Sequence, residues 1–275
     1  MRKLKRIFEE AVADNITGES AKVAYYFFLS LFPLILVLFA LTGLLGGERA
    51  FDWIMTQIQG RVPPQTAGLL RGAVREITSR PEAGTLGIGL LLTLWAASGG
   101  VTALADGLNR MYDVREDRGF LKKRGIALLL LVAGLVLLVG GALAIIAGVP
   151  IIRSLGVGPA AELGAWVLAF ILVVALFALV YYVLPNRDQS RSKATVLVGA
   201  VVGALVWLLA TTGFQVYVTN FGSYRATYGA IGAVIVLMFW LYLTALAILF
   251  GGEVASVLEG ARSGRRGEER AARAA

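Results

Sequence analysis

The 275 residues of this chain include neither cysteine nor histidine. Without cysteine the chain can form no disulfide, carries no thiol nucleophile and offers no thiolate to a metal ion. Without histidine it also lacks the commonest metal ligand and the usual acid–base group near neutral pH. The sequence therefore predicts neither a metal site nor a cofactor.

Charged side chains are scarce as well. Only 16% of the residues are charged and 57% are hydrophobic, and the mean hydropathy is +0.74. A soluble domain of this length could bury a full core, but its surface would need more charge than this. The composition therefore predicts a membrane protein.

Asp, Glu, Lys and Arg are missing altogether from six stretches, each at least 23 residues long. A helix needs about 20 apolar residues to cross the hydrocarbon core of a bilayer. The stretches cover residues 23–47, 83–105, 125–152, 163–186, 194–224 and 226–252. They predict an all-α, polytopic membrane protein with six transmembrane helices, at about 24–46, 84–108, 125–149, 163–184, 195–219 and 229–252. The first stretch is too long for the apolar part of a signal peptide, so we expect a retained span.

The Lys and Arg residues indicate how these spans are oriented. With a cytoplasmic N-terminus, 19 of the 26 basic residues fall in the predicted inner segments and seven in the outer ones. Cytoplasmic loops of membrane proteins carry such an excess. We therefore expect both termini in the cytoplasm. The net charge of +8 is spread over these segments, so nucleic acid is not an expected partner.

Three parts are expected along the chain. Residues 1–22 place apolar side chains at helical spacing beside basic ones, which predicts an amphipathic helix in the membrane interface. This stripe consists of Leu4, Ile7, Phe8, Ala11, Val12 and Ile16. Residues 23–258 form the predicted transmembrane domain, and residues 259–275, rich in Arg, Ala and Glu, are expected to be a disordered cytoplasmic tail.

Two features concern the first span and the connection after it. Pro33 lies in the span, where a proline removes one backbone hydrogen bond and bends the helix. Such a kink either shapes a cavity or only improves packing. The predicted outer connection, residues 48–82, contains two amphipathic stretches on either side of Pro63 and Pro64. Two short helices on the outer surface fit this pattern, either as a lid or as a resting hairpin.

Candidate path residues for a substrate or a coupling ion lie at the predicted inner boundary. Asp106, Asn109 and Arg110 stand at i, i+3 and i+4 and therefore share one helix face. A carboxylate at this depth is costly unless paired, so Asp106 either faces the bundle interior or forms a salt bridge with Arg110. Glu253 stands in the same place on the last span, and we expect it to meet Asp106 if their helices are neighbours.

A second polar group is expected at the outer boundary, between the fifth and sixth spans. It consists of Asn220, Tyr224, Arg225 and Tyr228. Arg225 suits anion binding or stacking on tyrosine, but interfacial aromatics with one snorkelling arginine explain the pattern equally well. Gly199 and Gly203 in the fifth span are spaced for close helix packing, better explained within one chain than between two copies. The oligomeric state stays undetermined.

Four segments of the sequence together resemble the YihY/BrkB family of bacterial inner-membrane proteins. They begin at Ala24, Leu94, Tyr181 and Val216 and read AYYFFLSLFPLILVLFAL, LWAASGGVTALADGLNRMYDV, YYVLPNRD and VYVTNFGSYRATYGAIGAVIVLMFWLYLTALAILFGGEV. The resemblance extends over about residues 5–258, in the order that the family shows. Its matching residues are Tyr25, Tyr26, Ser30, Pro33, Leu108, Asn109, Tyr112, Pro185, Asn186, Phe214, Tyr217, Asn220, Phe221, Gly222, Tyr228, Gly229, Trp240, Gly252 and Glu253.

This resemblance implies six transmembrane helices with both ends in the cytoplasm of a bacterium, which agrees with the charge distribution. It leaves the activity open. Members of the family have been called ribonuclease BN, a label regarded as mistaken, one is named as a serum-resistance virulence factor, and others are described as transporters or exporters.

Three functions are compatible with these patterns. The first is export or translocation of a lipid or small solute by alternating exposure of a groove, and few polar side chains in the spans favour a lipid. The second is a non-catalytic scaffold or envelope-integrity factor that acts through a partner. The third is a ribonuclease, which would need clustered carboxylates or histidines for metal-ion hydrolysis. The short loop with Asp113, Glu116 and Asp117 offers no such arrangement, so we expect no enzyme.

Overall fold

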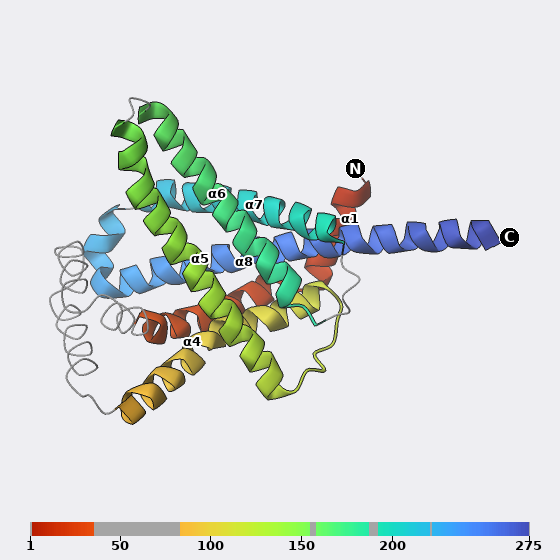
Figure 1. Cartoon of the computed structure of the whole chain (residues 1–275), viewed down its shortest axis with the longest axis horizontal. Coiled ribbons are helices and arrows are strands. Elements are labelled where there is room, and N and C mark those ends of the chain that lie inside the picture. The colour runs from red at the N-terminus through yellow and green to blue at the C-terminus, as the bar shows by residue number, and fades with distance from the viewer. Residues whose placement is uncertain (1, 36–82, 155–157, 187–191, 221, 275) are drawn as a thin grey trace. The chain divides into compact units, whose positions relative to one another are not determined.

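The structure is a computed structural model that describes residues 2–35, 83–154, 158–186, 192–220 and 222–274. Every regular element in these residues is an α-helix, as the sequence predicts (Figure 1). The second half of the first predicted span and both amphipathic stretches of residues 48–82 lie outside this part. The chain divides into two compact units, residues 1–26 with 101–275 and residues 27–100, and each is described by itself.

Five of the described helices are long and apolar enough to cross a membrane. They are α4 (Ala83–Met111), α5 (Phe120–Ser154), α6 (Gly158–Val183), α7 (Lys193–Asn220) and α8 (Gly222–Ala274). Their positions correspond to the second to sixth spans that the sequence predicts. The stretches that meet the criteria for a membrane span are 91–111, 120–141, 162–183, 193–218 and 234–260.

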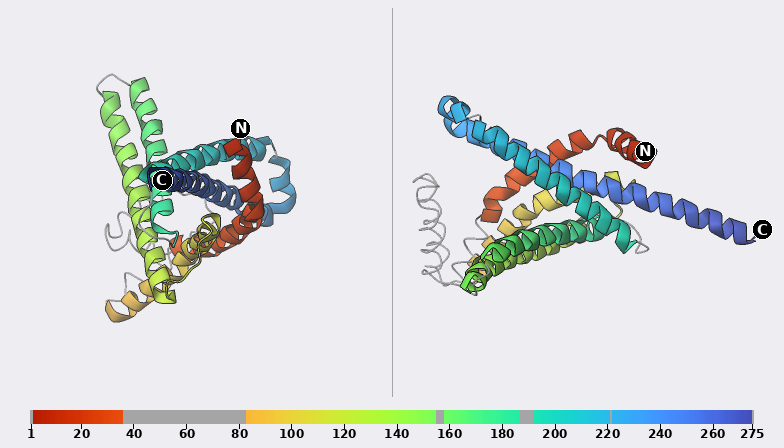
Figure 2. Two further views of the ribbon diagram at one scale, coloured as in Figure 1. Left: turned by 90° about the vertical axis from the view of Figure 1, so that its right-hand side faces the viewer. Right: turned by 90° about the horizontal axis from the view of Figure 1, so that it is seen from above.

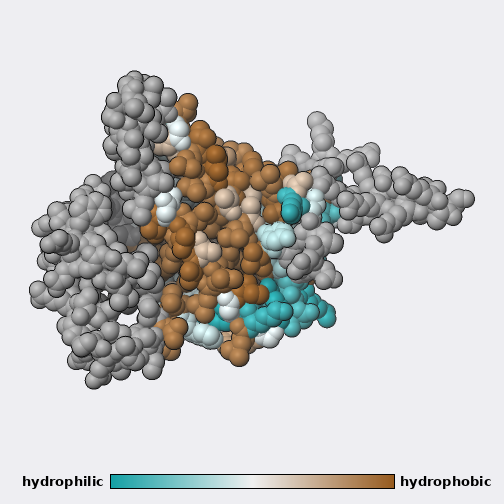
Figure 3. Space-filling view, viewed as in Figure 1, coloured by the Kyte–Doolittle hydropathy of each residue, from teal (hydrophilic) through white to brown (hydrophobic). Residues whose placement is uncertain are grey.

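Consecutive helices pack side by side in the first unit. The contacts run from α5 to α6, from α6 to α7 and from α7 to α8, the most extensive pair (Figures 1 and 2). Much of the apolar surface of these helices faces outward: Leu129, Trp166 and Leu209 are exposed, Trp166 to 74%. On the face shown in Figure 3, apolar side chains cover the helices, and hydrophilic ones gather where α5 begins. Such a surface suits lipid rather than water.

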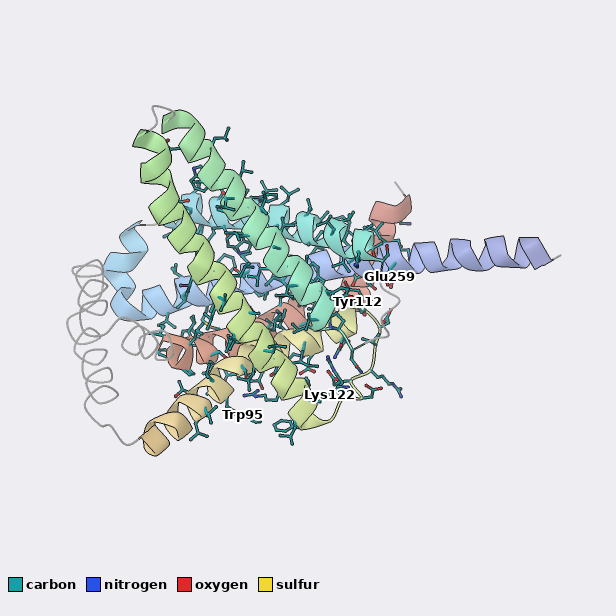
Figure 4. All side chains as sticks on the ribbon, viewed as in Figure 1. Trp95, Tyr112, Lys122 and Glu259 are labelled. Carbon is teal, nitrogen blue, oxygen red and sulfur yellow. The ribbon has the colours of Figure 1, made fainter. Side chains whose placement is uncertain are left out.

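The buried core of the first unit lies at one end of the helices, where α4 and α6 end and α5 and α7 begin; we call this the α4–α5 end. Leu108, Met111, Tyr181, Leu184 and Leu249 are all almost fully buried there. The Tyr181 hydroxyl donates a hydrogen bond to the Ile248 carbonyl of α8 at 2.7 Å. Tyr112 and Lys122, both labelled in Figure 4, also lie at this end.

Glycines allow α7 and α8 to approach each other closely. A Cβ atom on Gly199 would lie 2.5 Å from the Gly251 carbonyl oxygen and 2.6 Å from the Ala255 Cβ. A Cβ on Gly203 would lie 3.2 Å from the Ala247 carbonyl oxygen. The two glycines therefore serve packing within one chain, as the sequence predicts.

The N-terminal arm consists of two helices rather than one. Helix α1 (Arg2–Ala13) is followed by a turn in which Asn15 has a φ of 52°, the left-handed conformation that commonly ends a helix. The next helix covers residues 16–35. Part of the apolar stripe packs on the protein, because Ile7 and Ala11 of α1 are buried. Phe8 and Val12 are exposed on the same helix. Placement of α1 in the membrane interface stays a prediction.

The second unit brings the helix of residues 16–35 against α4. The Gly100 N–H donates to Ser30 Oγ at 2.8 Å, and a Cβ on Gly100 would lie 3.3 Å from the Phe27 Cα. A glycine is needed here because the two backbones come close. Pro33 lies two residues before the described part of this helix ends, so the bend expected at that residue stays a prediction.

The last helix continues beyond its predicted end. We expected a disordered tail after Glu259, whereas α8 remains helical to Ala274 and extends past α7 (Figures 1 and 2). The composition explains the difference, since Ala, Arg and Glu are strong helix formers. The tail also extends a helix that already exists, so it avoids the unfavourable first turn of an isolated helix.

Candidate functional site

The polar residues at the end of α4 have partners that the sequence did not suggest. Asp106 accepts a hydrogen bond from Lys123 Nζ of α5, and Arg110 forms an ion pair of 3.6 Å with Glu19. Of the two alternatives for Asp106, the salt bridge with Arg110 is therefore not the one formed. The reason is the basic first turn of α5, which returns beside α4 and provides a closer cation for Asp106. Arg124 in the same turn donates to Thr102 Oγ1 at 3.1 Å.

Asn109 holds the loop after α4 against the end of α6. Its amide nitrogen donates to Glu116 Oε2 at 2.9 Å, and its amide oxygen accepts from the Asn186 N–H at 2.7 Å. Arg118 completes the arrangement through Glu116 and the Leu184 carbonyl, with the latter bond 2.9 Å long. We call Asn109, Glu116, Arg118 and Asn186 the loop clasp. Asn109 is 4% exposed and uses both ends of its amide in the clasp, which is a structural role.

The ionisation of Glu116 reflects this clasp. Burial acts to raise the pKa of Glu116, but the hydrogen bonds and the positive charge of Arg118 outweigh burial and hold the pKa below its ordinary value. Arg118 Nε lies 2.6 Å from Glu116 Oε1, and Arg118 Nη2 lies 2.6 Å from Glu116 Oε2. This is the bidentate geometry that favours a charged carboxylate.

Two helix ends bring acidic residues to the α4–α5 end. After α4, the Val114 N–H bonds the Asn109 carbonyl and the Asp113 N–H bonds the Arg110 carbonyl, with Asp113 at a φ of 51°. This is a Schellman motif with Asp113 in its left-handed position. At the end of α1, the left-handed Asn15 follows Asp14 in a comparable turn. Both turns lie near Glu253 of α8, on which Asp14 and Asp113 act electrostatically.

Glu253 is the most deeply buried carboxyl group in the described part of the chain. The residue is 1% exposed, and the Asp14 carboxyl lies within hydrogen-bonding reach of its carboxyl group. Glu10 and Asp113 are close enough to add negative potential at the pair. Glu253 therefore lies with Asp14, whereas Asp106 is paired with Lys123.

Asp14 shows the electrostatic effect of this arrangement. Burial raises the pKa of the Asp14 carboxyl and the charges of Asp113 and Glu10 raise it further, whereas Arg110 and the contact with the Glu253 carboxyl lower it. The balance leaves the Asp14 pKa above its ordinary value. We call Asp14 and Glu253 the carboxyl pair.

Little in the sequence indicated the carboxyl pair. Asp14 stands ten residues before the first predicted span, which begins at about residue 24, and Asp113 looked like one acid among the arginines of a loop. The one usable signal was that both follow directly on a helix, at positions where Asp and Asn end helices well. No spacing rule connects them to residue 253, because three different elements meet there.

The outer group expected at Asn220, Tyr224, Arg225 and Tyr228 is not described at the level of side chains. Its role therefore stays a prediction. Among the described side chains, no three carboxylates stand in a geometry that could hold a metal ion.

Comparison with known proteins decides the family. The sequence model of the family described as virulence factor BrkB matches residues 7–275. The chain belongs to the virulence factor BrkB family. It is also 30% identical over 267 residues to a Bacillus subtilis (strain 168) protein named ribonuclease-like, YfkH, covering 93% of this chain and 94% of that one. No solved structure matches the chain.

Other relatives are named only as membrane proteins. UPF0761 membrane proteins of Pseudoalteromonas atlantica and Aeromonas salmonicida are each 30% identical to this chain. The alignments cover 90% and 89% of this chain, and 82% and 84% of the relatives. Together with the five candidate spans, these matches identify the chain as an integral membrane protein of the BrkB family.

Several of the motif residues that suggested the BrkB family come together at the α4–α5 end. Leu108 and Tyr112 are buried there, Asn109 and Asn186 belong to the loop clasp, and Glu253 belongs to the carboxyl pair. A Cβ on the neighbouring Gly252 would lie 2.6 Å from Leu108 Cδ2. Motifs that are far apart in the sequence thus form one region of the first unit.

Proposed function

We propose that this BrkB-family protein is a transporter or translocator that moves a lipid or a small solute across the cytoplasmic membrane. The observation that carries the proposal is the carboxyl group of Glu253, which is 1% exposed within an apolar candidate span. An ionisable group in such a position is expensive, and in membrane proteins it commonly marks a substrate or ion pathway.

The topology that this function requires is part of the proposal. We propose six spans with both termini in the cytoplasm, with the α4–α5 end on the cytoplasmic side. Support comes from the basic residues Arg115, Arg118, Lys122, Lys123 and Arg124, which follow α4 and begin α5. The carboxyl pair then lies at the inner opening of the path, and the residues 220–228 lie at its outer end.

A lipid fits the described helices better than a polar solute does. Their outward faces are apolar, and polar side chains within the spans form bonds inside the protein, as Trp207 Nε1 does with Thr244 Oγ1 at 3.2 Å. A lipid needs only a polar furrow for its headgroup, because its chains stay in the bilayer. The bilayer itself is the partner that this proposal requires, and a bound phospholipid is the expected ligand.

Lipid movement in proteoliposomes tests the proposal. The purified protein is reconstituted with a headgroup-labelled phospholipid, and a membrane-impermeant reagent quenches the label in the outer leaflet. We expect quenching beyond half of the label with the native protein, and quenching close to half with Glu253→Gln. The control Glu9→Gln makes the same chemical change at an exposed ion pair on α1, and we expect it to behave as the native protein does.

The outcomes separate the alternatives. If quenching stops at half for the native protein, uncoupled lipid movement is ruled out. If Glu253→Gln and the native protein quench alike, the path does not involve Glu253. A further variant, Asp106→Asn, breaks the ion pair with Lys123 and tests whether the exposed side of α4 contributes.

A scaffold that acts through a partner is the second candidate. The observation in its favour is the continuation of α8 past Glu259 to Ala274. This extension is a helical surface that a partner protein could bind. Ribonuclease activity, suggested by the name of the Bacillus subtilis relative, finds no support in the loop carboxylates. Glu116 is bonded to Arg118 and Asp117 accepts a hydrogen bond from Asn186, so both are engaged within the protein.

A further inference from the structure

The hydrogen bonding of Glu253 poses a chemical problem. Its Oε2 atom is buried and has no hydrogen-bond donor among the described groups. The Asp14 carboxyl lies within hydrogen-bonding reach of the Glu253 carboxyl. A carboxylate only accepts hydrogen bonds, so two carboxylates can bond to each other only when one of them carries a proton.

The surroundings of the carboxyl pair are negative rather than positive. Glu10 from α1 and Asp113 from the turn after α4 both add negative potential. The cation that acts on Asp14 is Arg110 of α4, and it also forms an ion pair with Glu19 of the 16–35 helix. Like charges in contact strongly disfavour ionisation of both groups, as in the paired carboxylates of aspartic proteases.

A proton fits this place better than a metal ion does. Among the described residues, no group of three acidic side chains could hold a metal ion. This includes Asp14, Glu253, Glu10 and Asp113. A single proton between two carboxyl groups needs no third ligand, and it removes one negative charge from a buried position. It also gives the pair the one donor that it lacks.

Besides the carboxyl pair, the contacts seen between α1 and α8 in the described part of the chain are apolar. Ile7 of α1 packs with Val254 and Val257 of α8, and the Phe8 and Phe250 rings have centroids 5.9 Å apart. Asp14 directly follows α1, about two helical turns beyond Ile7. Attachment of α1 to α8 therefore depends on a small apolar cluster together with the bond between Asp14 and Glu253.

We infer that Asp14 and Glu253 form a proton-binding site in which one proton is held between the two carboxyl groups and fastens α1 to α8. Loss of the proton changes the charge of the pair from −1 to −2, and the two carboxylates then repel each other beside Glu10 and Asp113. The result is a weaker attachment of α1. This inference goes beyond the proposed transport and does not depend on it.

The raised pKa of Asp14 gives the sign of the effect. A carboxyl group with a raised pKa binds its proton more tightly when α1 is docked than when it is free. The docked state is therefore favoured at low pH, and the advantage is lost as the pH rises through the pKa of the docked state. Attachment of α1 should weaken on alkalinisation.

The absence of cysteine allows a direct test. Ile7→Cys places the only thiol of the chain in the buried contact with α8, and Val12→Cys places it on the same helix at a side chain that is 78% exposed. Each variant, in lipid nanodiscs, is labelled with a membrane-impermeant maleimide from about pH 5 to about pH 9, above the ordinary pKa of carboxyl groups. The rate for Ile7→Cys divided by that for Val12→Cys cancels the ionisation of the thiol.

We expect this ratio to rise by about tenfold for each pKa unit that separates the docked and free states. In the Glu253→Gln background the neutral amide replaces the protonated acid, so the ratio should stay low at every pH. Asp14→Asn neutralises the other carboxyl of the pair and should also keep the ratio low at every pH. The test therefore remains possible if one of the two variants does not fold. Glu9→Gln should leave the native pH dependence unchanged.

Two results would overturn the inference. One is a ratio that does not change with pH in the native background, and the other is an unchanged rise in both neutralised backgrounds. Infrared spectra provide a second measurement, because a protonated carboxyl has a carbonyl band that an ionised one lacks. That band should persist at neutral pH in the native protein and weaken in Glu253→Gln. Neither measurement needs transport, so failure of the proposed function leaves them interpretable.

Discussion

Glu116 shows at the scale of single residues how a polar side chain can organise the end of an apolar bundle. It accepts hydrogen bonds from Asn109, from the Arg118 backbone and from the Arg118 guanidinium. The guanidinium also bonds the Leu184 carbonyl, which connects the loop to the end of α6. Charge-assisted bonds of this kind are stronger than neutral ones, so Glu116 contributes to stability mainly as a carboxylate.

Glu116→Gln should therefore lower the melting temperature in detergent by several degrees at neutral pH. The Glu116 pKa is lowered in the folded protein, so its contribution is complete above the unfolded pKa and is lost as the pH falls through the folded pKa. The difference between the native protein and the variant should accordingly shrink on acidification. Melting curves at a series of pH values measure this.

The matched control for this prediction is Glu9→Gln, which removes an exposed ion pair with Lys5 on α1. Exposed pairs contribute little, so its melting temperature should stay close to that of the native protein. A difference between the native protein and Glu116→Gln that stays constant or grows toward low pH would contradict the account of the loop clasp.

At the scale of elements, α7 and α8 depend on glycine more than on any polar contact. The backbone of α8 at Gly251 occupies the space that a side chain at Gly199 would need. Since both obstructing groups, the Gly251 carbonyl and the Ala255 Cβ, belong to the facing helix, neither can rotate away. In a membrane, helices associate through this kind of close packing because lipid removes most of the hydrophobic driving force.

Gly199→Ala should separate the two helices and destabilise the protein by roughly 1–3 kcal/mol, the usual effect of overpacking. Gly213→Ala is the matched control on the same helix, because a Cβ at Gly213 meets nothing within 4 Å. Thermal denaturation of both variants in the same detergent measures the difference. Equal melting temperatures for the two variants would show that α7 and α8 do not pack as described.

At the scale of the whole molecule, the proposed topology can be tested with single cysteines in the cysteine-free chain. Asp117 lies between α4 and α5 and Glu162 begins the next candidate span, and both are exposed. Because one span separates them, their labels should react on opposite sides of the membrane. We expect Glu162→Cys to react with an impermeant thiol reagent in intact cells and Asp117→Cys to react only after permeabilisation.

The native chain provides the blank for this experiment, because it has no thiol to label. Labelling of both variants in intact cells would rule out a membrane crossing by α5. Labelling of Asp117→Cys alone would reverse the orientation derived from the basic residues and would place the carboxyl pair on the outer side.

The sequence by itself determined the family, the helical class and the places of five candidate spans. Long runs without charge leave little choice, because a backbone in lipid must satisfy its own hydrogen bonds as a helix. It also identified Glu253 and Asn109 as polar groups in unusual places. What it could not provide was their partners, since helical spacing relates residues within an element and not between elements.

Only the tertiary structure decided which side chains meet. In the structure, Asp106 pairs with Lys123, and Asn109 bonds Glu116 in the loop clasp. Glu253 lies against Asp14, which is 239 positions earlier in the sequence. Such a contact follows from the turns at Asn15 and Asp113 and from the packing of α1 on α8. The physical reason is that the energy of a buried charge depends on its neighbours in space, and the chain acquires these neighbours only on folding.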